Sequence, residues 1–375
     1  MSLSFRVAAR DGSARTGVLT TPHAAVETPA FLPVGTQGSV KGLDPQELTA
    51  MGARMLLANT YHLYLRPGAG VVRRLGGLHR FMQWPGGILT DSGGFQILSL
   101  SSLRQVDDQG VVFRSHLDGS LHALTPEGAV AIQEELGADI ITVLDECLPY
   151  PVEEARAADS VRRTLDWARR CRESHRTDQA LFAIVQGAAF PRLRRRCAEE
   201  LAALDFPGYA VGGLSVGEPK ELTWEVLGET TAHLPPEKPR YLMGVGEPAD
   251  LLAGVATGVD LFDCVLPTRL GRHGMLLTAR GRLSVRSARF AQDASPPDPD
   301  CGCTVCRRFS RAYLRHLFRS GELLGPRLAS QHNVYFLLRL MAQARDAIRA
   351  GSLAEFTGSF LARYRENAWR KGCVT

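Results

Sequence analysis

Acidic side chains follow short apolar runs at three separate points of this chain. Asp91, Asp145 and Asp263 each come at the end of such a run, and Gln186 ends a fourth. One aspartate in such a place would be explained by a helix cap or a loop hydrogen bond. Three of them, together with the glutamine, predict one shared site in which carboxylates bind a substrate or attack it.

The same groups match the hydrogen-bonding edge of a purine. A carboxylate can accept from both the N1–H and the exocyclic amine of a guanine-like base. The amide of Gln186 and a backbone N–H of the turn at residues 212–213 can meet the base carbonyl, while Phe95 and Met243 could pack on the ring faces. Another carboxylate is free to attack an anomeric carbon, as in retaining glycosidases. The residue types alone do not decide which aspartate has which role.

A second group of chemically active residues lies near the C-terminus. Cys301, Cys303 and Cys306 bring three thiols together in one short segment. His332 would complete a tetrahedral zinc site of the structural type, which has no open coordination position. His316 is a competing fourth ligand, but residues 311–318 have the pattern of a helix that runs away from the cysteines. We therefore predict one structural Zn²⁺ per chain, and reduced thiols elsewhere.

Arginine supplies nearly all of the positive charge, because the chain has only four lysines among its 44 basic residues. Scattered arginines therefore carry little weight, and only clusters without acids indicate a site. Residues 192–196 contain four arginines, but their pattern is typical of the exposed face of a helix. Residues 264–292 could bind phosphate groups beside Asp263, or serve as a basic patch for solubility or an acidic partner. This basic segment holds six arginines and no acid: Arg269, Arg272, Arg280, Arg282, Arg286 and Arg289.

The apolar runs that carry these residues have the length and continuity of strands buried on both faces of a parallel sheet. Helix signals separate them, such as Asp44 before Pro45 and Thr125 before Pro126, and residues 153–172 are long and amphipathic. Eight strands alternating with helices predict an α/β fold, a (β/α)8 TIM barrel, with a doubly wound open sheet as the alternative. The predicted strands are residues 31–36, 55–59, 87–90, 140–144, 181–185, 209–212, 241–245 and 259–262.

Two segments interrupt this alternation and suggest how the chain is divided. Residues 111–121 have the pattern of a hairpin that turns at Asp118 and Gly119. We assign residues 1–265 to the barrel with an N-terminal extension and this hairpin. Residues 266–335 would form the basic segment and an inserted zinc-binding subdomain, and residues 336–375 would form C-terminal helices that pack on the barrel.

The composition is that of an ordinary globular protein. The 375 residues are 45% hydrophobic and 22% charged, and the net charge of +5 permits an anionic partner without requiring one. No apolar stretch approaches the length of a membrane span, and residues 1–10 lack the apolar core of a signal peptide. We therefore expect a cytoplasmic protein with no membrane partner.

Taken in order, these motifs resemble one family, the tRNA-guanine transglycosylases of the bacterial type. The likeness runs from about residue 5 to residue 350 and includes the cysteine cluster with its distant histidine. It implies that Asp263 is the nucleophile that displaces guanine and forms a covalent enzyme–RNA intermediate, and that Asp91 is the general acid and base. The matching stretches are residues 81–84, 89–96, 145–147, 184–187, 211–218, 241–246 and 262–269.

The resemblance also implies the remaining roles. Zinc would be held by Cys301, Cys303, Cys306 and His332. The anticodon loop of a tRNA with a uridine-guanosine-uridine core would be held by Thr268, Arg269 and Arg272. The family usually forms homodimers, and the segment around Phe309, Tyr313 and His316 is the expected contact, with packing inside one chain as the alternative. The base would be bound by Asp91, Ser92, Phe95, Asp145, Gln186, Gly213, Leu214 and Met243.

The natural incoming base depends on smaller features. Cys147 and Val216 match the bacterial pattern, which implies 7-aminomethyl-7-deazaguanine and a role in queuosine biosynthesis. The carbonyl of Leu214 would suit the cation of that base. Leu148 and Ala188 depart from the usual pattern without removing a reacting group.

Two other functions remain as alternatives. A non-catalytic RNA-binding accessory subunit of the same family would be expected to lack the reacting aspartates, which are present here. An unrelated barrel hydrolase acting on a glycoside or nucleoside would leave the basic segment and the cysteine cluster without a purpose.

Overall fold

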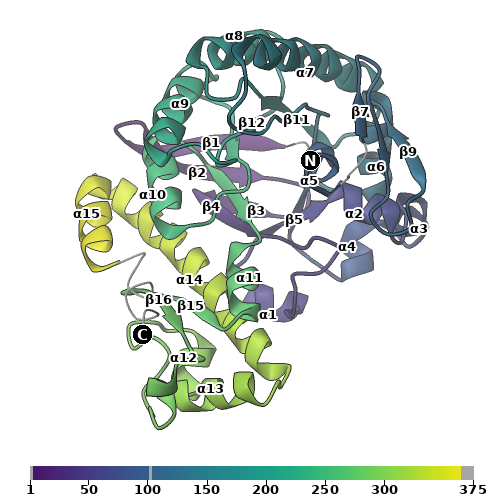
Figure 1. Cartoon of the computed structure of the whole chain (residues 1–375). Coiled ribbons are helices and arrows are strands. Elements are labelled where there is room, and N and C mark those ends of the chain that lie inside the picture. The colour runs from purple at the N-terminus through teal and green to yellow at the C-terminus, as the bar shows by residue number, and fades with distance from the viewer. Residues whose placement is uncertain (1–2, 101–103, 365–375) are drawn as a thin grey trace.

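Eight parallel strands form the centre of the computed structural model, which describes residues 3–100 and 104–364 (Figure 1). The strands are hydrogen-bonded in the order β4-β14-β13-β12-β11-β10-β6-β5, and a parallel bridge between Val34 and Leu57 joins the two ends. The predicted TIM-like barrel is confirmed, and each predicted run overlaps a strand, with bounds that differ by up to three residues. Their bounds are β4 (Ala30–Pro33), β5 (Met55–Asn59), β6 (Gly87–Asp91), β10 (Ile140–Thr142), β11 (Ala180–Val185), β12 (Tyr209–Val211), β13 (Arg240–Leu242) and β14 (Leu261–Cys264).

Helices cover the outside of the barrel, so that almost every strand residue is buried. Two begin at the predicted signals: Asp44 forms a capping box with Glu47, and the Thr125 hydroxyl accepts from the N–H of Gly128. These caps satisfy backbone donors that a helix start leaves unpaired. The helices are α1 (Pro45–Ala50), α2 (Thr60–Leu65), α3 (Ala69–Arg74), α4 (Gly77–Met82), α5 (Gly94–Leu100), α6 (Pro126–Leu136), α7 (Glu154–Ser174), α8 (Pro191–Ala202), α9 (Lys220–Ala232) and α10 (Pro248–Ala256).

Two antiparallel sheets flank the barrel. The expected hairpin is present as β8 (Val111–Arg114) and β9 (Leu121–Leu124), with β7 (Arg104–Val106) as a third strand that was not predicted. The N-terminal extension forms a second sheet, also not predicted, from β1 (Ser4–Asp11), β2 (Ala14–Thr20) and β3 (Ala25–Thr28). Every second residue of β1 is exposed, so this strand lacks the continuous apolar run that marks the barrel strands.

A buried ion pair attaches this N-terminal sheet to the barrel. Arg15 on β2 and Asp260 before β14 are both fully buried, and the Arg15 Nε donates to Asp260 Oδ1 at 3.0 Å. The same guanidinium donates to the carbonyls of Pro236 at 2.6 Å and Lys238 at 2.7 Å. Every nitrogen of this guanidinium therefore donates to groups from the last third of the barrel.

Replacing Asp260 by alanine is expected to lower the free energy of unfolding by about 3–5 kcal/mol, because it leaves a buried guanidinium without its counter-ion. Urea unfolding of the purified protein measures this change. Glu199→Ala is the matched control, because it removes exposed contacts with Arg195 at 2.9 Å and His233 at 3.3 Å and should cost at most about 1 kcal/mol. Equal losses in the two variants would contradict a special role for the buried pair.

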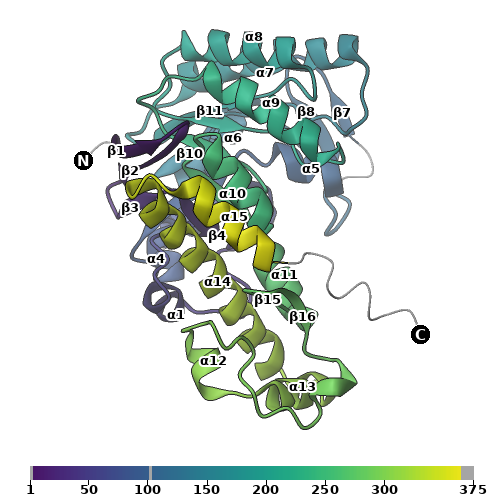
Figure 2. The ribbon, with the colours of Figure 1, turned by 90° about the vertical axis from the view of Figure 1, so that its left-hand side faces the viewer.

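After β14 the chain leaves the barrel and forms a small subdomain, residues 275–319, which has its own apolar core around Leu276, Val305 and Leu314. Figures 1 and 2 show it below the barrel, with one long helix running from it along the barrel side. No helix among the described residues is both long and apolar enough to span a bilayer. The elements are α11 (Leu266–Arg272), β15 (Met275–Thr278), β16 (Gly281–Ser284), η1 (Ala288–Phe290), α12 (Thr304–Arg308), α13 (Arg311–Arg319), α14 (Leu324–Arg349) and α15 (Leu353–Arg363).

Helix α14 belongs to both parts of the molecule. It carries His332 toward the small subdomain, and Arg345 near its other end donates to the carbonyl of Pro29 beside β4 at 2.9 Å. The helix is continuous across residue 335, where we placed a division of the chain. Residues 365–375 of the expected C-terminal segment lie outside the described residues.

Candidate active site and metal centre

Asp91 ends β6 and is held by three donors. Its carboxylate accepts from the Asn59 side-chain amide, from the N–H of Thr60 at 3.0 Å and from Gln96 Nε2 at 2.8 Å. Asn59 is the register partner of Asp91 on the neighbouring strand β5. No role was predicted for Asn59 or Gln96, although the position of Asn59 at a strand end was a usable signal. These three hydrogen bonds fix the orientation of the Asp91 carboxylate.

Burial, with a smaller contribution from the charge of Asp263, raises the pKa of Asp91 to about 6, against the lowering effect of its hydrogen bonds. A carboxyl group with this pKa is populated in both protonation states near neutral pH. Such a group can give a proton to one molecule and take one from the next.

Asp263 lies on β14, and the hydrogen bonds that it accepts within the described part of the chain reach one oxygen of its carboxylate. Its Oδ1 accepts from the Tyr241 hydroxyl at 2.6 Å and from the N–H of Gly244 at 2.9 Å. Oδ2 has no hydrogen-bond partner among the described residues. Burial raises the pKa of Asp263, while the two donors lower it. The geometry therefore leaves one oxygen of a fixed carboxylate available for attack.

Asp145 forms a second acidic centre, with Ser92 and Gln186. Gln186 Nε2 donates to Asp145 Oδ2 at 2.6 Å, and the Ser92 hydroxyl donates to Oδ1 at 3.1 Å. Burial raises the pKa of Asp145 to about 6, against these hydrogen bonds. The structure thus brings three of the predicted base-binding residues into direct contact.

The Gly212 and Gly213 turn packs on the Gln186 amide. A Cβ atom would lie 2.7 Å from Gln186 Nε2 at Gly212 and 2.3 Å from Gln186 Oε1 at Gly213, which also has a φ of +64°. Only glycine fits such a close approach. The rest of this loop is held by Glu218, which was not predicted and accepts from the N–H groups of Ser215 at 2.5 Å and Val216 at 2.9 Å.

Phe95 and Met243 are connected to the acidic groups through the next residues of the chain, Gln96 and Gly244. Phe95 is 48% exposed, so a ring face remains free to stack, whereas Met243 is half-buried. A cavity of about 270 Å³ adjoins Asp145 and is also lined by Gly94 and Cys147. Cys147 and Leu214 are themselves buried.

The predicted metal ligands converge on one point. Nδ1 of His332 lies 3.8 Å from the Sγ of Cys301, 3.5 Å from that of Cys303 and 3.2 Å from that of Cys306. The other ring nitrogen is 2.7 Å from the carbonyl oxygen of Leu277, to which it can donate, so Nδ1 is free to face the sulfurs. These four residues could hold a metal ion, and His316 is not part of the group.

A second cluster, formed by His23, His79 and Asp139, has a different geometry. The imidazole rings stack with centroids 3.6 Å apart and an interplanar angle of 18°. His23 Nδ1 lies 2.7 Å from Asp139 Oδ1, and His79 Nε2 lies 3.1 Å from Oδ2. Parallel rings that face separate oxygens do not direct their lone pairs to one point. We therefore interpret this cluster as a hydrogen-bonded carboxylate rather than a metal site.

The residues predicted to bind RNA lie on α11, directly after Asp263. Thr268 is buried and accepts from Arg272 Nη1 at 3.2 Å, whereas Arg269 is exposed. The helix that directly follows Asp263 therefore carries both of these arginines.

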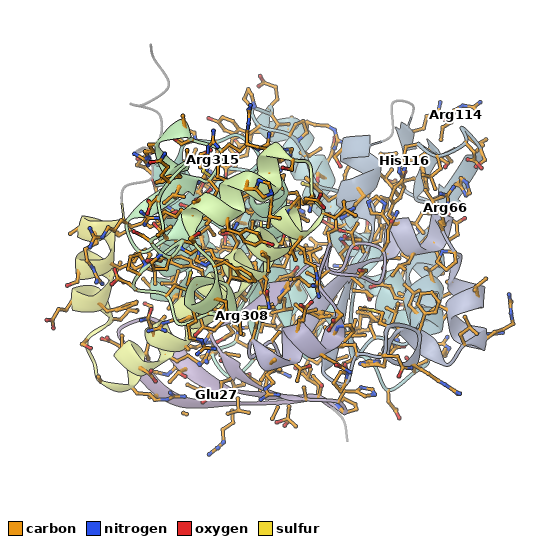
Figure 3. All side chains as sticks on the ribbon, turned by 90° about the horizontal axis from the view of Figure 1, so that it is seen from below. Glu27, Arg66, Arg114, His116, Arg308 and Arg315 are labelled. Carbon is orange, nitrogen blue, oxygen red and sulfur yellow. The ribbon has the colours of Figure 1, made fainter. Side chains whose placement is uncertain are left out.

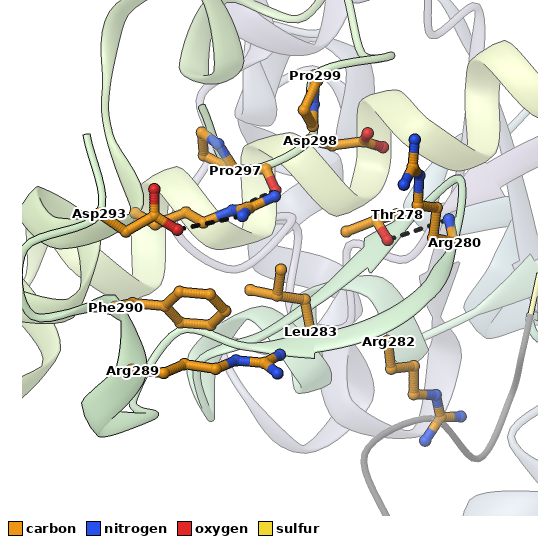
Figure 4. Close-up of a pocket in the computed structure, with 11 residues that line it drawn as sticks. Thr278, Arg280, Arg282, Leu283, Arg289, Phe290, Asp293, Pro297, Asp298 and Pro299 are labelled. Carbon is orange, nitrogen blue, oxygen red and sulfur yellow. Dashed lines mark hydrogen bonds and ion pairs between the residues drawn. The ribbon is translucent and has the colours of Figure 1, made fainter. Parts of the chain in front are cut away.

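The other arginines of the basic segment are distributed more widely than the sequence suggests. Arg280, Arg282 and Arg289 line a cavity of about 580 Å³ together with Arg311 (Figure 4). Acids from outside the segment neutralise part of this charge, because Arg282 pairs with Glu247 and Arg311 pairs with Asp293. Arginines also lie far apart on the molecule, with Arg308 and Arg315 on one side and Arg66 and Arg114 on another (Figure 3). Charge alone therefore does not define one RNA-binding face.

One sequence-based interpretation was wrong. Arg194 belongs to the arginine cluster at residues 192–196 that we took for an exposed helix face, yet it is fully buried, while Arg192, Arg195 and Arg196 are exposed. The spacing of the sequence could have indicated that Arg194 is buried, because Arg194 and Leu201 share a helix face with the two small buried residues Cys197 and Ala198.

Buried carboxylates at the ends of barrel strands, with a separate three-cysteine, one-histidine group, define a barrel enzyme that has a distinct metal-binding unit. Comparisons with known proteins agree. The family model described as queuine tRNA-ribosyltransferase matches residues 11–366. Curated proteins of that name are 56% identical in Pelotomaculum thermopropionicum, over 97% of this chain and 100% of the relative, and 55% identical in Moorella thermoacetica, over 97% and 98%. The chain belongs to the queuine tRNA-ribosyltransferase family, the pentosyltransferases of the tRNA-guanine transglycosylase class.

Proposed function

We propose that this enzyme exchanges the guanine at the wobble position of tRNAs with a UGU anticodon-loop core for 7-aminomethyl-7-deazaguanine, a step of queuosine biosynthesis. The observation that carries the proposal is the difference between two buried aspartates at strand ends, of which Asp263 influences the pKa of Asp91 through its charge. Asp91 is held by three donors, whereas Asp263 is held through one oxygen and has the other available. A double displacement needs these two kinds of carboxylate, one that moves protons and one that attacks.

In the first displacement, Oδ2 of Asp263 forms a bond to C1′ of the wobble nucleotide as the glycosidic bond to guanine breaks. The electron pair of that bond leaves with the base, and the protonated form of Asp91 supplies its proton. The product is an ester between Asp263 and the RNA. Tyr241 and Gly244 keep the attacking carboxylate in place by binding its other oxygen.

In the second displacement, the incoming base loses its N9 proton to the carboxylate form of Asp91, and N9 attacks C1′. The ester bond breaks, and its electron pair returns to Asp263. The raised pKa of Asp91, about 6, supports both directions of proton transfer by one residue.

Base recognition is assigned to the second acidic centre. Asp145 would accept from the N1–H and exocyclic amine, while Gln186 and the N–H of Gly213 would donate to the base carbonyl. Ser92 orients Asp145, and Phe95 and Met243 would contact the ring faces. The carbonyl of Leu214 would accept from the aminomethyl cation, beside the cavity that Cys147 lines.

Two elements outside the base-binding centre would contact the RNA and a second copy of the chain. Thr268, Arg269 and Arg272, which all lie on α11, would contact the anticodon loop. Phe309, Tyr313 and His316 stack in sequence on the small subdomain, and the 38% exposure of Tyr313 leaves a surface for a second copy in a homodimer. We expect the enzyme to act in the cytoplasm, where tRNA is modified.

Incubation with a tRNA that has a wobble guanine and with radiolabelled guanine tests the proposal. We expect label to enter the RNA, and 7-aminomethyl-7-deazaguanine to compete with the label more strongly than queuine does. A folded protein that binds tRNA without incorporating label would be an accessory subunit. Release of free base from a nucleoside alone would instead indicate a hydrolase.

The rate of covalent capture is expected to fall as the pH rises through about 6, by about tenfold per unit, because only protonated Asp91 can assist the departing base. A single-turnover assay without free base, read as RNA bound to denatured enzyme, measures this step alone. Asp91→Asn should be much slower and lack this descending limb. An unchanged descending limb in that variant would remove Asp91 from the proton transfer.

The Cys₃His group fits Zn²⁺ best, because three thiolates and an imidazole form a closed set of the type that structural zinc prefers. The ion would tie residues 301–306 to α14. Cys303→Ser is expected to lower bound zinc from about one ion per chain to less than about 0.2 and to destabilise the small subdomain. Elemental analysis after gel filtration measures this. His316→Gln and His23→Gln, at histidines outside the group, should retain the metal, and loss in either would contradict the ligand assignment.

A further inference from the structure

The buried guanidinium of Arg194 connects the ends of two neighbouring barrel strands. Its Nε donates to the carbonyl of Ala188 at 2.7 Å, its Nη1 to that of Val185 at 3.4 Å and its Nη2 to that of Gly213 at 3.1 Å. Val185 ends β11, and Gly213 follows β12. All three nitrogens of one side chain therefore bind backbone carbonyls at the edge where the acidic groups lie.

This placement is costly for a charged group. Arg194 is fully buried, and burial lowers its pKa to about 10. In the part of the chain that the structure describes, no carboxylate lies within ion-pair distance of it; the charged form is stabilised by backbone oxygens instead. A buried cation of this kind is expected only where its hydrogen bonds fix something that an apolar side chain could not fix.

The carbonyls that Arg194 binds belong to residues on both sides of Gln186 in the chain and to the glycine that packs on its side-chain amide. Val185 precedes Gln186, and Ala188 lies two residues after it with a positive φ of 49°, a conformation that is costly for alanine and is kept only where the surroundings hold it. After the next strand, β12, Gly213 approaches Gln186 so closely that a Cβ atom at Gly213 would lie 2.3 Å from Gln186 Oε1. Gln186 in turn donates to Asp145 at 2.6 Å. One continuous set of contacts thus leads from Arg194 to the centre that we assign to the base.

We propose that Arg194 is a positioning residue for base recognition. It holds the carbonyl of Gly213, and with it the backbone of that glycine, next to Gln186, so that the N–H of Gly213 and the Gln186 amide present their donors together to the carbonyl oxygen of the bound guanine. This inference rests on the proposed function. Arg194 itself touches neither the base nor the ribose.

Calorimetric binding of guanine and of 6-thioguanine to the whole enzyme tests this role, because the two bases differ only in the acceptor at position 6, and sulfur accepts hydrogen bonds weakly. We expect Arg194→Met to weaken guanine binding about 10- to 100-fold and 6-thioguanine binding by less than about threefold. In turnover, KM for guanine should rise by a similar factor while kcat stays within about threefold. Arg194→Lys, which has one nitrogen in place of a planar fork, should show the same selective loss in weaker form.

Arg195→Met is the matched control, because Arg195 is the next residue on α8 but is 58% exposed and forms a surface pair with Glu199. It should bind both bases as the parent enzyme does. A purely structural Arg194 would weaken both bases equally, and that outcome in folded Arg194→Lys would overturn the inference. If the parent enzyme itself bound no guanine, the proposed function would fail first, before the variants were compared.

Discussion

The variant Asp263→Asn is expected to abolish covalent capture of RNA, with a loss of at least about 10⁴-fold, because an amide is a far poorer nucleophile than a carboxylate. Electrophoresis of denatured enzyme after incubation with tRNA detects the covalent complex directly. The substitution is nearly isosteric, and the amide oxygen can still accept from Tyr241 and Gly244. The site should therefore keep its shape while losing the attacking oxygen.

Two measurements separate this result from a general loss of structure. Guanine binding by Asp263→Asn should remain within about threefold of the parent value, because Asp145 and Gln186 are unchanged. The unfolding midpoint should also stay close to that of the parent enzyme. RNA trapped covalently by this variant would show that another residue is the nucleophile.

The second large effect is expected at Asp145. Asp145→Asn should raise the dissociation constant for guanine about 100-fold, because an amide offers one acceptor oxygen and turns two donors toward the donors of the base. The affinity for hypoxanthine, which lacks the exocyclic amine, should fall by a smaller factor. Calorimetry with both bases measures the difference, and Asp166→Asn on the exposed side of α7 is the control carboxylate.

The same residue predicts a pH dependence of binding. With a pKa of about 6, Asp145 is ionised at pH 7.5 and gains a proton as the pH falls through 6. A protonated carboxyl group loses one acceptor, so guanine affinity of the parent enzyme should decline below pH 6. Asp145→Asn should show a flat profile there. Parallel profiles for the two proteins would place the titrating group elsewhere.

The sequence was sufficient to predict the barrel, because its strands are buried on both faces and therefore appear as continuous apolar runs. Once the strands were predicted, the polar residues at their ends could be selected, because parallel strands present their carboxyl ends at one edge. These residues are Asp91, Asp145, Gln186 and Asp263. The cysteine cluster was equally visible, because thiol spacing is a local property of the chain.

The parts that were missed depend on contacts between distant segments. β1 is half exposed, so its sequence lacks the apolar continuity of a barrel strand. Arg282 appeared free of acids because its partner Glu247 lies outside the basic segment. Arg194 appeared exposed because its neighbours are, although its contacts with Val185 and Gly213 are what bury it. Local pattern identifies elements and candidate residues, whereas the partners of each side chain are set by the folded chain.

The pairing of the first barrel strand with the last has a consequence for biosynthesis. β4 is hydrogen-bonded to β14, and Arg15 can form its ion pair only after Asp260, 245 residues later in the chain, has been synthesised. At the usual synthesis rates this separation corresponds to an interval of roughly 12–50 s. During that time the edge of the apolar strand β4 has no partner and can pair with other nascent chains. We therefore expect productive folding of this enzyme to require that the edge of β4 stays unpaired with other chains until β14 has been synthesised.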